Sequence, residues 1–283
     1  MKRKILCCGL TTIDLIEKVD ALPAHGTKVQ ADTAFIDVGG PATNAARTVS
    51  ALGHEAHLLS LIGVGPLAQL ARGILAGADV AVTDLAHSGA PAVSTILLTP
   101  DGERTVVSAN NAGREAAYPD ASVLDRVDAV VVDGHLLPVQ VPLARQARQS
   151  GIPVILDAGS YKPGLDALLG LSTHIIASAD FRLPDNPATD IELVTELYSM
   201  GPTLAARSAG PKEVIAAIDG NIHTIPITPA PRIADTLGAG DVLHGAFAAA
   251  LADERSELEA LVAATQLATL STRFPGALGW SRD

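Results

Sequence analysis

Short apolar runs alternate with amphipathic stretches along most of this chain, and this alternation restricts the fold more than any other feature. Runs typical of buried strands lie at residues 5–9, 56–62, 129–132, 153–156, 174–177 and 203–206. Helical patterns lie at residues 42–52, 67–75, 141–149, 190–200, 242–251 and 257–270. Alternating strands and helices form a mostly parallel sheet covered on both faces. The sequence therefore predicts one three-layer α/β/α sandwich over residues 1–283, with ligands at the carboxyl ends of the strands.

Two segments break the alternation, at about residues 12–38 and 91–109. Both contain shorter and more polar alternating runs. In the second, Pro100-Asp101-Gly102-Glu103 separates two such runs, and Asp-Gly is a strong hairpin signal. We expect these strands to leave the main sheet and form a small β-sheet lid. An ordinary edge hairpin is the alternative, and apolar lid faces would favour a homodimer through the lid.

Composition restricts partners and compartment. With 48% hydrophobic and 18% charged residues, the chain has the composition of a compact folded protein. A net charge of −11 argues against nucleic acid as the main partner, although a local site for a nucleotide remains compatible with it. The adjacent Cys7 and Cys8 cannot form an ordinary disulfide and fit a reducing compartment. No secretory signal and no run of ~20 apolar residues is apparent, so we expect a cytoplasmic protein without a membrane partner.

The segment with the clearest chemistry is Asp235-Thr236-Leu237-Gly238-Ala239-Gly240-Asp241, directly before the expected helix 242–251. Glycines let backbone N–H groups converge on one point, and a helix start adds partial positive charge. Such a place binds an anion, here through the N–H groups of residues 237–240. A carboxylate beside an anion hole fits a general base, so Asp241 is the candidate catalytic residue. An Asp before a helix is also a common N-cap.

A second segment, Gly39-Gly40-Pro41-Ala42-Thr43-Asn44, fits a sugar site. The glycines allow the backbone to approach a polyol, and Pro41 suits the first position of a helix. Asn44 then lies in the first turn, where its amide offers a donor and an acceptor to a hydroxyl. Asp14, expected at the end of the first strand, can accept from two neighbouring hydroxyls. Taken alone, each of these residues also fits a turn or a cap.

Together the two segments resemble the signatures of the ribokinase/PfkB family of carbohydrate kinases. The family's usual forms are a double glycine followed by an Asn, and Asp-Thr-x-Gly-Ala-Gly-Asp. Here they occur in the family's order, and the resemblance covers about residues 4–279. It implies a ribokinase-like fold with a β-sheet lid. It also implies phosphoryl transfer from Mg·ATP to a primary hydroxyl of a sugar.

The resemblance also implies roles for individual residues. The catalytic loop and base would be Gly238, Ala239, Gly240 and Asp241. The sugar would contact Asp14, Gly39, Gly40, Asn44 and Asn110, the last placed after the hairpin together with Asn111. The nucleotide would contact Ser178, Ser208, Gly210, Thr236, Gly238 and Gly240, with adenine against Ala264, Leu267, Ala268 and residues 272–277. Asp235 would help to hold a monovalent cation such as K⁺.

The chain departs from the family at the Asn-x-x-Glu motif that organises Mg²⁺. Ser178 takes the Asn place and Phe181 the Glu place, so Asp180 is the nearest carboxylate for the Mg²⁺ environment. Ser208-Ala209-Gly210 replaces Thr-x-Gly, and Gly63-Val64-Gly65-Pro66 lacks the usual Asp. A similar Ser-x-Asp variation occurs in the ketohexokinase and sulfofructose kinase branches. This favours a ketose such as fructose or a derivative, with a pentose as the next candidate.

Two other functions stay open. A nucleoside kinase would share the fold and the base, but usually presents an aromatic side chain to the nucleobase, and this chain is only 3% aromatic. A non-catalytic sugar- or nucleotide-binding relative would fit the missing Glu. Lys162 and Arg104 each fit either a phosphate contact or a solvated surface residue, and His244 is expected to pack in its helix or border the site.

Overall fold

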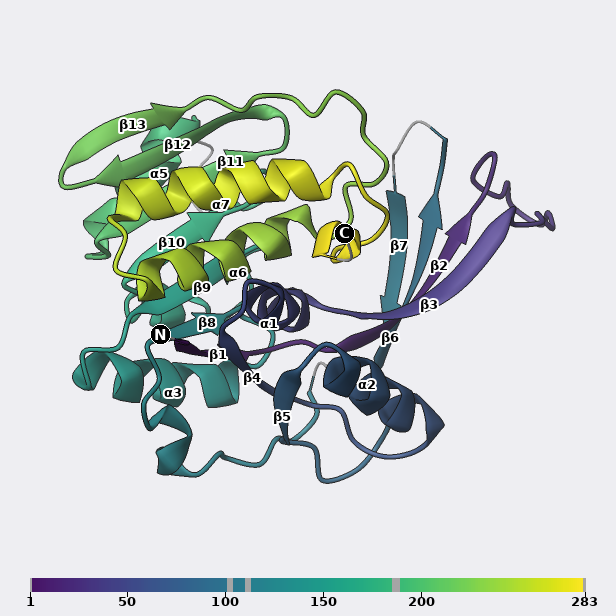
Figure 1. Ribbon diagram of the computed structural model, residues 1–283, viewed down its shortest axis with the longest axis horizontal. Coiled ribbons are helices and arrows are strands. Elements are labelled where there is room, and N and C mark those ends of the chain that lie inside the picture. Colours follow the sequence, from purple (N-terminus) through teal and green to yellow (C-terminus); the bar gives the residue numbers. More distant parts are fainter. Residues whose placement is uncertain (1, 101–103, 110–112, 185–188, 282–283) are drawn as a thin grey trace.

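The fold is built on two sheets, seen in a computed structural model that describes residues 2–100, 104–109, 113–184 and 189–281 (Figure 1). The nine-stranded main sheet has the order β13-β12-β11-β10-β9-β8-β1-β4-β5. Its strands are β1 (Lys4–Cys8), β4 (Glu55–Ser60), β5 (Val80–Asp84), β8 (Ala129–Val132), β9 (Val154–Ala158), β10 (His174–Ala177), β11 (Leu204–Ala209), β12 (Lys212–Ile218) and β13 (Asn221–Ile225). Neighbouring strands run parallel from β11 through β10, β9, β8, β1 and β4 to β5. The strands β12 and β13 pair antiparallel at the other edge. The predicted mostly parallel sheet is confirmed, and the sequence analysis missed β5, β12 and β13.

Helices cover both faces of the main sheet, which confirms the three layers. The helices α1 (Pro41–Ala51), α2 (Pro66–Gly77), α6 (Ala239–Ala252) and α7 (Glu257–Ser271) pack on one face. The helices α3 (Leu137–Gln149), α4 (Asp166–Leu169) and α5 (Asp190–Ser199) pack on the other. Short 3₁₀ turns lie at η1 (Ala121–Leu124) and η2 (Gly279–Ser281). The helix α3 starts at Leu137, whereas the sequence predicted a start at residue 141.

The second sheet is the predicted lid. Its order is β3-β2-β6-β7, with β2 (Thr12–Lys18), β3 (Thr33–Gly39), β6 (Ala92–Leu98) and β7 (Arg104–Ala109). In Figure 1 it extends away from the main sheet, beside the C-terminal segment. Ile16, Ile96 and Leu98 form its small apolar core, and Leu237 of the glycine segment packs against them. The lid therefore contacts the loop that carries the candidate anion hole.

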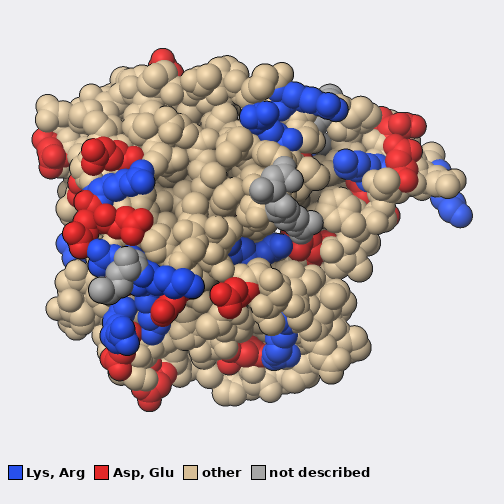
Figure 2. All heavy atoms as spheres, viewed as in Figure 1, with Lys and Arg blue, Asp and Glu red and all other residues tan. Residues whose placement is uncertain are grey.

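The surface carries mixed charges. On the face in Figure 2, Lys and Arg side chains lie interspersed with Asp and Glu. In the described part of the chain, no helix combines the length and apolarity needed to cross a membrane.

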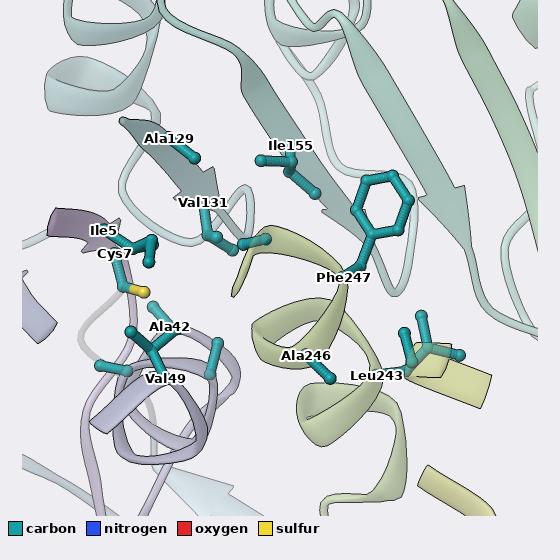
Figure 3. Packing of buried hydrophobic residues seen from close by; sticks show 14 of the residues in the cluster. Ile5, Cys7, Ala42, Val49, Ala129, Val131, Ile155, Leu243, Ala246 and Phe247 are labelled. Carbon is teal, nitrogen blue, oxygen red and sulfur yellow. The ribbon is translucent and has the colours of Figure 1, made fainter. Parts of the chain in front are cut away.

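Close packing of α6 on α1 joins the two motifs found in the sequence. Figure 3 shows α1, with Ala42 and Val49, next to the side of α6 that carries Ala246, whereas Phe247 of α6 points towards Ile155 of β9. The contact depends on Gly245, because a Cβ there would lie 2.5 Å from the carbonyl oxygen of Ala45. The first turns of the two helices are thereby held side by side.

We predict that Gly245→Ala destabilises the fold by about 1–3 kcal/mol, because the added methyl group must push the two helices apart. Helix propensity alone gives the opposite sign, since Ala is favoured over Gly by about 1 kcal/mol. Gly73→Ala in α2 is the matched control, because a Cβ there meets nothing within 4 Å. Urea unfolding of both variants is the measurement, and an equally stabilised Gly245→Ala protein would contradict the close contact.

Candidate active site

The glycine segment forms an open helix start. Gly238 caps α6 in the left-handed region at φ 72°, and a Cβ there would overlap Ala277. The N–H groups of Gly238, Gly240 and Asp241 donate to no acceptor among the described residues. A Cβ at Gly240 would meet nothing within 4 Å, so the loop is uncovered at this point. Free N–H groups at the start of a long helix are suited to an anion.

One part of the expected anion hole is wrong. The N–H of Leu237 donates to Asp235 Oδ1 at 2.8 Å and is therefore not free to face a phosphoryl group. The N–H of Ala239 makes a long contact of 3.4 Å with the carbonyl oxygen of Thr236. The free donors thus come from Gly238, Gly240 and Asp241.

Asp241 is held by Asn44 from the other motif. Asn44 Nδ2 donates to Asp241 Oδ2 at 2.7 Å, although the two residues are 197 positions apart in sequence. The amide oxygen of Asn44 is buried and receives no hydrogen bond from any described residue. A buried acceptor without a donor costs free energy, so this oxygen is available to a hydroxyl of a ligand.

The surroundings of Asp241 oppose its ionisation. Burial raises the pKa of Asp241 to about 7, and the negative charge of Asp157 adds to the effect. The hydrogen bond from Asn44 and the nearby His244 act in the opposite direction. Asp157 is the second-last residue of β9 and Asp133 directly follows β8, so both carboxylates stand at the carboxyl edge of the main sheet. The sequence analysis gave neither of them a role, although each is an Asp directly after an apolar strand.

Asp235 fastens the glycine segment to the C-terminal segment. Its Oδ1 accepts from Leu237, and its Oδ2 accepts from the N–H of Gly276 at 2.9 Å. The residue is 6% exposed. Each carboxylate oxygen keeps a lone pair after these bonds, so Asp235 still fits the role of one oxygen ligand to a cation.

The residues expected to contact the sugar lie where the lid meets α1, with one correction. Asp14 lies on β2 of the lid, because β1 already ends at Cys8, and not at the end of the first strand. Thr12 Oγ1 donates to Asp14 Oδ1 at 2.6 Å, which lowers the pKa of the Asp14 carboxyl, whereas burial raises it more strongly. Asn110 and Asn111 lie outside the described residues.

The glycine pair makes room for the protein's own atoms. A Cβ at Gly39 would overlap the carboxylate of Asp14, and a Cβ at Gly40 would overlap the carbonyl oxygen of Leu10. Gly40 also has φ 99°, a conformation that side chains disfavour. The pair therefore lets the chain approach Asp14 as well as any ligand.

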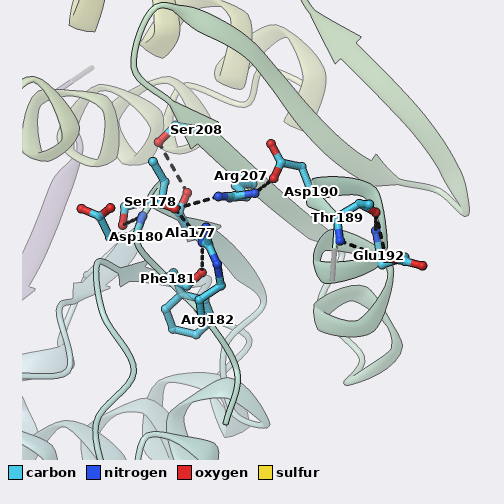
Figure 4. Close-up of polar contacts among 11 residues, drawn as sticks. Ala177, Ser178, Asp180, Phe181, Arg182, Thr189, Asp190, Glu192, Arg207 and Ser208 are labelled. Carbon is cyan, nitrogen blue, oxygen red and sulfur yellow. Dashed lines mark hydrogen bonds and ion pairs between the residues drawn. The ribbon is translucent and has the colours of Figure 1, made fainter. Parts of the chain in front are cut away.

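Two of the residues expected to contact the nucleotide, Ser178 and Ser208, lie at the ends of β10 and β11 (Figure 4). Ser178 Oγ donates to the carbonyl oxygen of Gly159 at 2.7 Å, and Ser208 Oγ to that of Ala177 at 3.4 Å. Phe181 is fully buried, so the position where the family carries Glu belongs to the core here. Asp180 is exposed next to it.

Arg207 is a residue that the sequence analysis missed. It is 5% exposed, donates to the carbonyl oxygen of Ala179 at 2.7 Å and pairs with Asp190 of α5 (Figure 4). It thereby holds the loop after β10, including Asp180, against α5. The signal was available, because Arg207 interrupts an apolar strand and a buried cation needs partners.

The structure shows the surroundings of two basic residues, Arg104 and Lys162, whose roles the sequence left open. Arg104 Nη1 of β7 donates to Thr236 Oγ1 at 3.0 Å, which is a second contact between the lid and the glycine segment. Lys162 lines a cavity of about 350 Å³ at the carboxyl edge of the main sheet, together with Gly9, Ser60 and Gly134. Ala264 is fully buried in the core, so it cannot contact adenine as expected.

Comparison with known proteins identifies the family of this chain. The model of the pfkB family carbohydrate kinases matches residues 2–280, nearly the whole chain. The chain belongs to this family. It is a carbohydrate kinase, an enzyme that transfers a phosphoryl group to an alcohol.

Three relatives show which proteins this kinase resembles in sequence and structure. Mouse ketohexokinase is 26% identical over 285 residues, which cover 94% of this chain and 95% of that protein. A putative ribokinase from Agrobacterium tumefaciens has a structure with TM-score 0.89 and 26% identity, covering 99% of this chain and 94% of the other. Arabidopsis thaliana ribokinase, solved in complex with ribose and ATP, shares the fold with TM-score 0.76 and 18% identity over 100% of both chains.

We predict that Asp241→Asn stabilises the kinase more at pH 8 than at pH 4.5. The pKa of Asp241 is raised from 3.8 to about 7, so the folded state binds more protons than the unfolded state in that interval. Wild-type stability therefore falls as pH rises through the interval, and the substitution removes this loss. We expect a gain at pH 8 that exceeds the gain at pH 4.5 by about 1 kcal/mol or more.

Urea unfolding at several pH values measures the difference between variant and wild type. Asp219→Asn, on the exposed turn between β12 and β13, controls for the substitution itself. A difference that does not change with pH would show that Asp241 ionises normally in the folded protein.

Proposed function

We propose that this kinase transfers the γ-phosphoryl group of Mg·ATP to a primary hydroxyl of a sugar, with Asp241 as the general base. The observation that carries the proposal is the contact between Asp241 and Asn44 beside the free N–H groups of the helix start. The hydroxyl gives its proton to the Asp241 carboxylate while its oxygen attacks the γ-phosphorus. The bond from the γ-phosphorus to the leaving oxygen breaks, and ADP departs.

The proposed base suits a hydroxyl acceptor. A carboxylate that releases its proton near neutral pH is also able to take one from a hydroxyl as the bond to phosphorus forms. The free N–H groups of Gly238, Gly240 and Asp241 would stabilise the negative charge of the transferring group, with Ala239 completing the turn. Thr236 would contact the phosphates after release from Arg104.

The proposed sugar site lies between α1 and the lid. The unpaired amide oxygen of Asn44 would accept from one hydroxyl, and Asp14 from others. Gly39 and Gly40 would let the sugar approach the backbone, and Asn110 would close the site from the lid side. Because Leu237 and Arg104 connect the lid to the glycine segment, the proposed sugar and phosphate regions would adjoin each other.

The nucleotide would lie along the ends of β10 and β11 towards the C-terminal segment. Ser178, Ser208 and Gly210 supply polar groups and an open backbone there, with Gly210 at φ 59°. Adenine would lie against residues 272–277 with Leu267 and Ala268, which are partly exposed.

Two cations fit this proposal. No cluster of three metal-binding side chains occurs in the described residues, which suits Mg²⁺ held mainly by substrate phosphates and one carboxylate. Asp180, which is exposed after β10, would take this role, whereas Asp235 would contribute one ligand to K⁺. Mg²⁺ would neutralise phosphate charge during transfer.

A ketose such as fructose or a derivative is the favoured substrate, followed by a pentose. The Ser-x-Asp stretch at Ser178 and the 26% identity to mouse ketohexokinase support the ketose. A nucleoside kinase is less favoured, because few aromatic side chains are available for a nucleobase.

We further propose a cytoplasmic enzyme and a homodimer through the lid, where Val106 and Val107 of β7 are 47% and 69% exposed.

We predict that Asp241→Asn lowers turnover about 10²–10⁴-fold, because the amide cannot accept the proton. The amide oxygen can still accept the hydrogen bond from Asn44, so sugar binding should persist. The measurement is ADP release from Mg·ATP over a panel of ketoses, aldoses and nucleosides, beside calorimetric binding. Asp219→Asn is the control and should retain wild-type turnover. A protein that binds sugar or ATP without any turnover would instead be a binding relative.

We also predict that Asp180→Asn raises the Mg²⁺ concentration needed for half-maximal turnover several-fold, because one anionic ligand is lost. Turnover at saturating Mg²⁺ should fall much less. A Mg²⁺ titration of turnover at fixed ATP, again with Asp219→Asn beside it, is the measurement. Unchanged Mg²⁺ dependence would remove Asp180 from the metal environment.

A further inference from the structure

His244 sits one turn after Asp241 in α6, enclosed by oxygen atoms that can only accept hydrogen bonds. Its Nδ1 lies 2.7 Å from the carbonyl oxygen of Gly240 and 3.4 Å from Asp157 Oδ2. Its Nε2 lies 3.2 Å from the carbonyl oxygen of Ile176 in β10. The residue is 4% exposed, so water does not supply other partners freely.

This geometry favours a proton on both ring nitrogens. A neutral imidazole has one N–H and one lone pair, and the lone pair would then face an oxygen lone pair at hydrogen-bond distance. The imidazolium donates from both nitrogens and satisfies both carbonyl groups. Asp157, which is 8% exposed, provides the compensating negative charge that a buried cation needs.

His174 gives a contrast within the same protein. It is equally buried, but its two nitrogens face the hydroxyl groups of Thr173 and Thr203, and a hydroxyl can donate or accept. Burial lowers the pKa of His174 to about 4, so this ring is neutral at neutral pH. His174 also has a carboxylate within reach, since its Nε2 lies 4.0 Å from Glu257 Oε1, so the carbonyl partners of His244 are what distinguish the two rings.

The charged groups that face this cluster come from several elements. Asp157 and Asp133 stand at the ends of β9 and β8, and Asp241 stands in the first turn of α6. Lys162 and His135 oppose the negative charge of Asp157 from the loops after β9 and β8. His244 is the only one of the opposing groups that lies on the helix of Asp241 itself.

We propose that His244 is a positioning residue of the phosphoryl-transfer site, kept as an imidazolium that offsets the charge of Asp157 beneath Asp241. The inference rests on the proposed function only in taking Asp241 as the base. Without the cation, the negative charge of Asp157 would act on Asp241 with less compensation, and Asp241 would hold its proton to higher pH.

A second effect follows from the bond to Gly240. The carbonyl group of Gly240 and the N–H of Asp241 belong to one peptide unit, and that N–H is among the free donors of the helix start. A charge-assisted hydrogen bond to the carbonyl oxygen polarises the whole unit. The imidazolium therefore holds the turn in place and strengthens a donor that faces the anion.

The protonation state is tested first, without any substrate. The kinase is labelled with ¹⁵N-histidine, and ring nitrogen shifts are recorded by NMR at pH 7.5, with His244→Gln identifying the His244 signals. We expect both nitrogens of His244 to show the imidazolium pattern, while His174 shows a neutral ring. A neutral His244 would overturn the proposal, whatever the enzyme phosphorylates.

The effect on the base is tested by a double-mutant cycle on the acid limb of the kcat/KM–pH profile. We expect His244→Gln to move the limb up by about one pH unit and Asp157→Asn to move it down. The double variant should return close to wild type, because both charges are gone. Loosened packing would not shift the acid limb in opposite directions in the two single variants and restore it in the double variant. Thermal unfolding of each variant monitors the packing.

Two results decide between the proposals. If the limb stays in place in both single variants, His244 does not act on Asp241 and the positioning role is wrong. If no compound is phosphorylated while NMR shows the imidazolium, the proposed function fails and the charge state stands. In that case urea unfolding of the same four proteins against pH reports the pKa of Asp241, and unchanged profiles would overturn the positioning role.

Discussion

The hydrogen bond between Asn44 and Asp241 is the interaction on which the site depends. It joins the first turns of α1 and α6, which come from opposite ends of the chain. Gly245 lets the two helices pack closely, which keeps their first turns side by side. Packing in the core thus determines a distance at the site, and both motifs of the sequence are parts of one structure.

Electrostatics at the carboxyl edge of the sheet follows from the same packing. Parallel strands end together, so an Asp at the end of β8 and one at the end of β9 come close to the helix start. Burial of these carboxylates costs free energy unless cations and N–H donors surround them. His244, Lys162 and Asn44 meet that need. This arrangement keeps the pKa of the Asp241 carboxyl near neutral, well above the ordinary range of an Asp.

The sequence was sufficient for the architecture and for the main motifs. Apolar strands, helix patterns and the Asp-Gly turn each carry a local signal, so the parallel sheet and the lid were predictable. The strands β12 and β13 were missed because an antiparallel edge hairpin lacks the long apolar run of a central strand. Asp14 was placed on the wrong strand, because a chain leaving β1 and entering the lid shows no break in its pattern.

Contacts between distant segments were not predictable in the same way. Nothing local indicates that Arg104 reaches Thr236, that Leu237 gives its N–H to Asp235, or that Asp157 lies against His244. Each depends on how elements far apart in the chain pack together, which one sequence does not encode locally. Ala264 illustrates the same limit, because its small apolar side chain fits a core position and a ligand surface equally well.

The overlap between Gly39 and Asp14 has an evolutionary consequence. The two positions share one volume, which holds either a carboxylate from β2 or a side chain from β3. A side chain at position 39 therefore requires that the carboxylate of Asp14 turn away or that position 14 carry a shorter residue. The glycine at position 39 thus leaves room for the carboxylate at position 14, and the two positions should vary together across relatives.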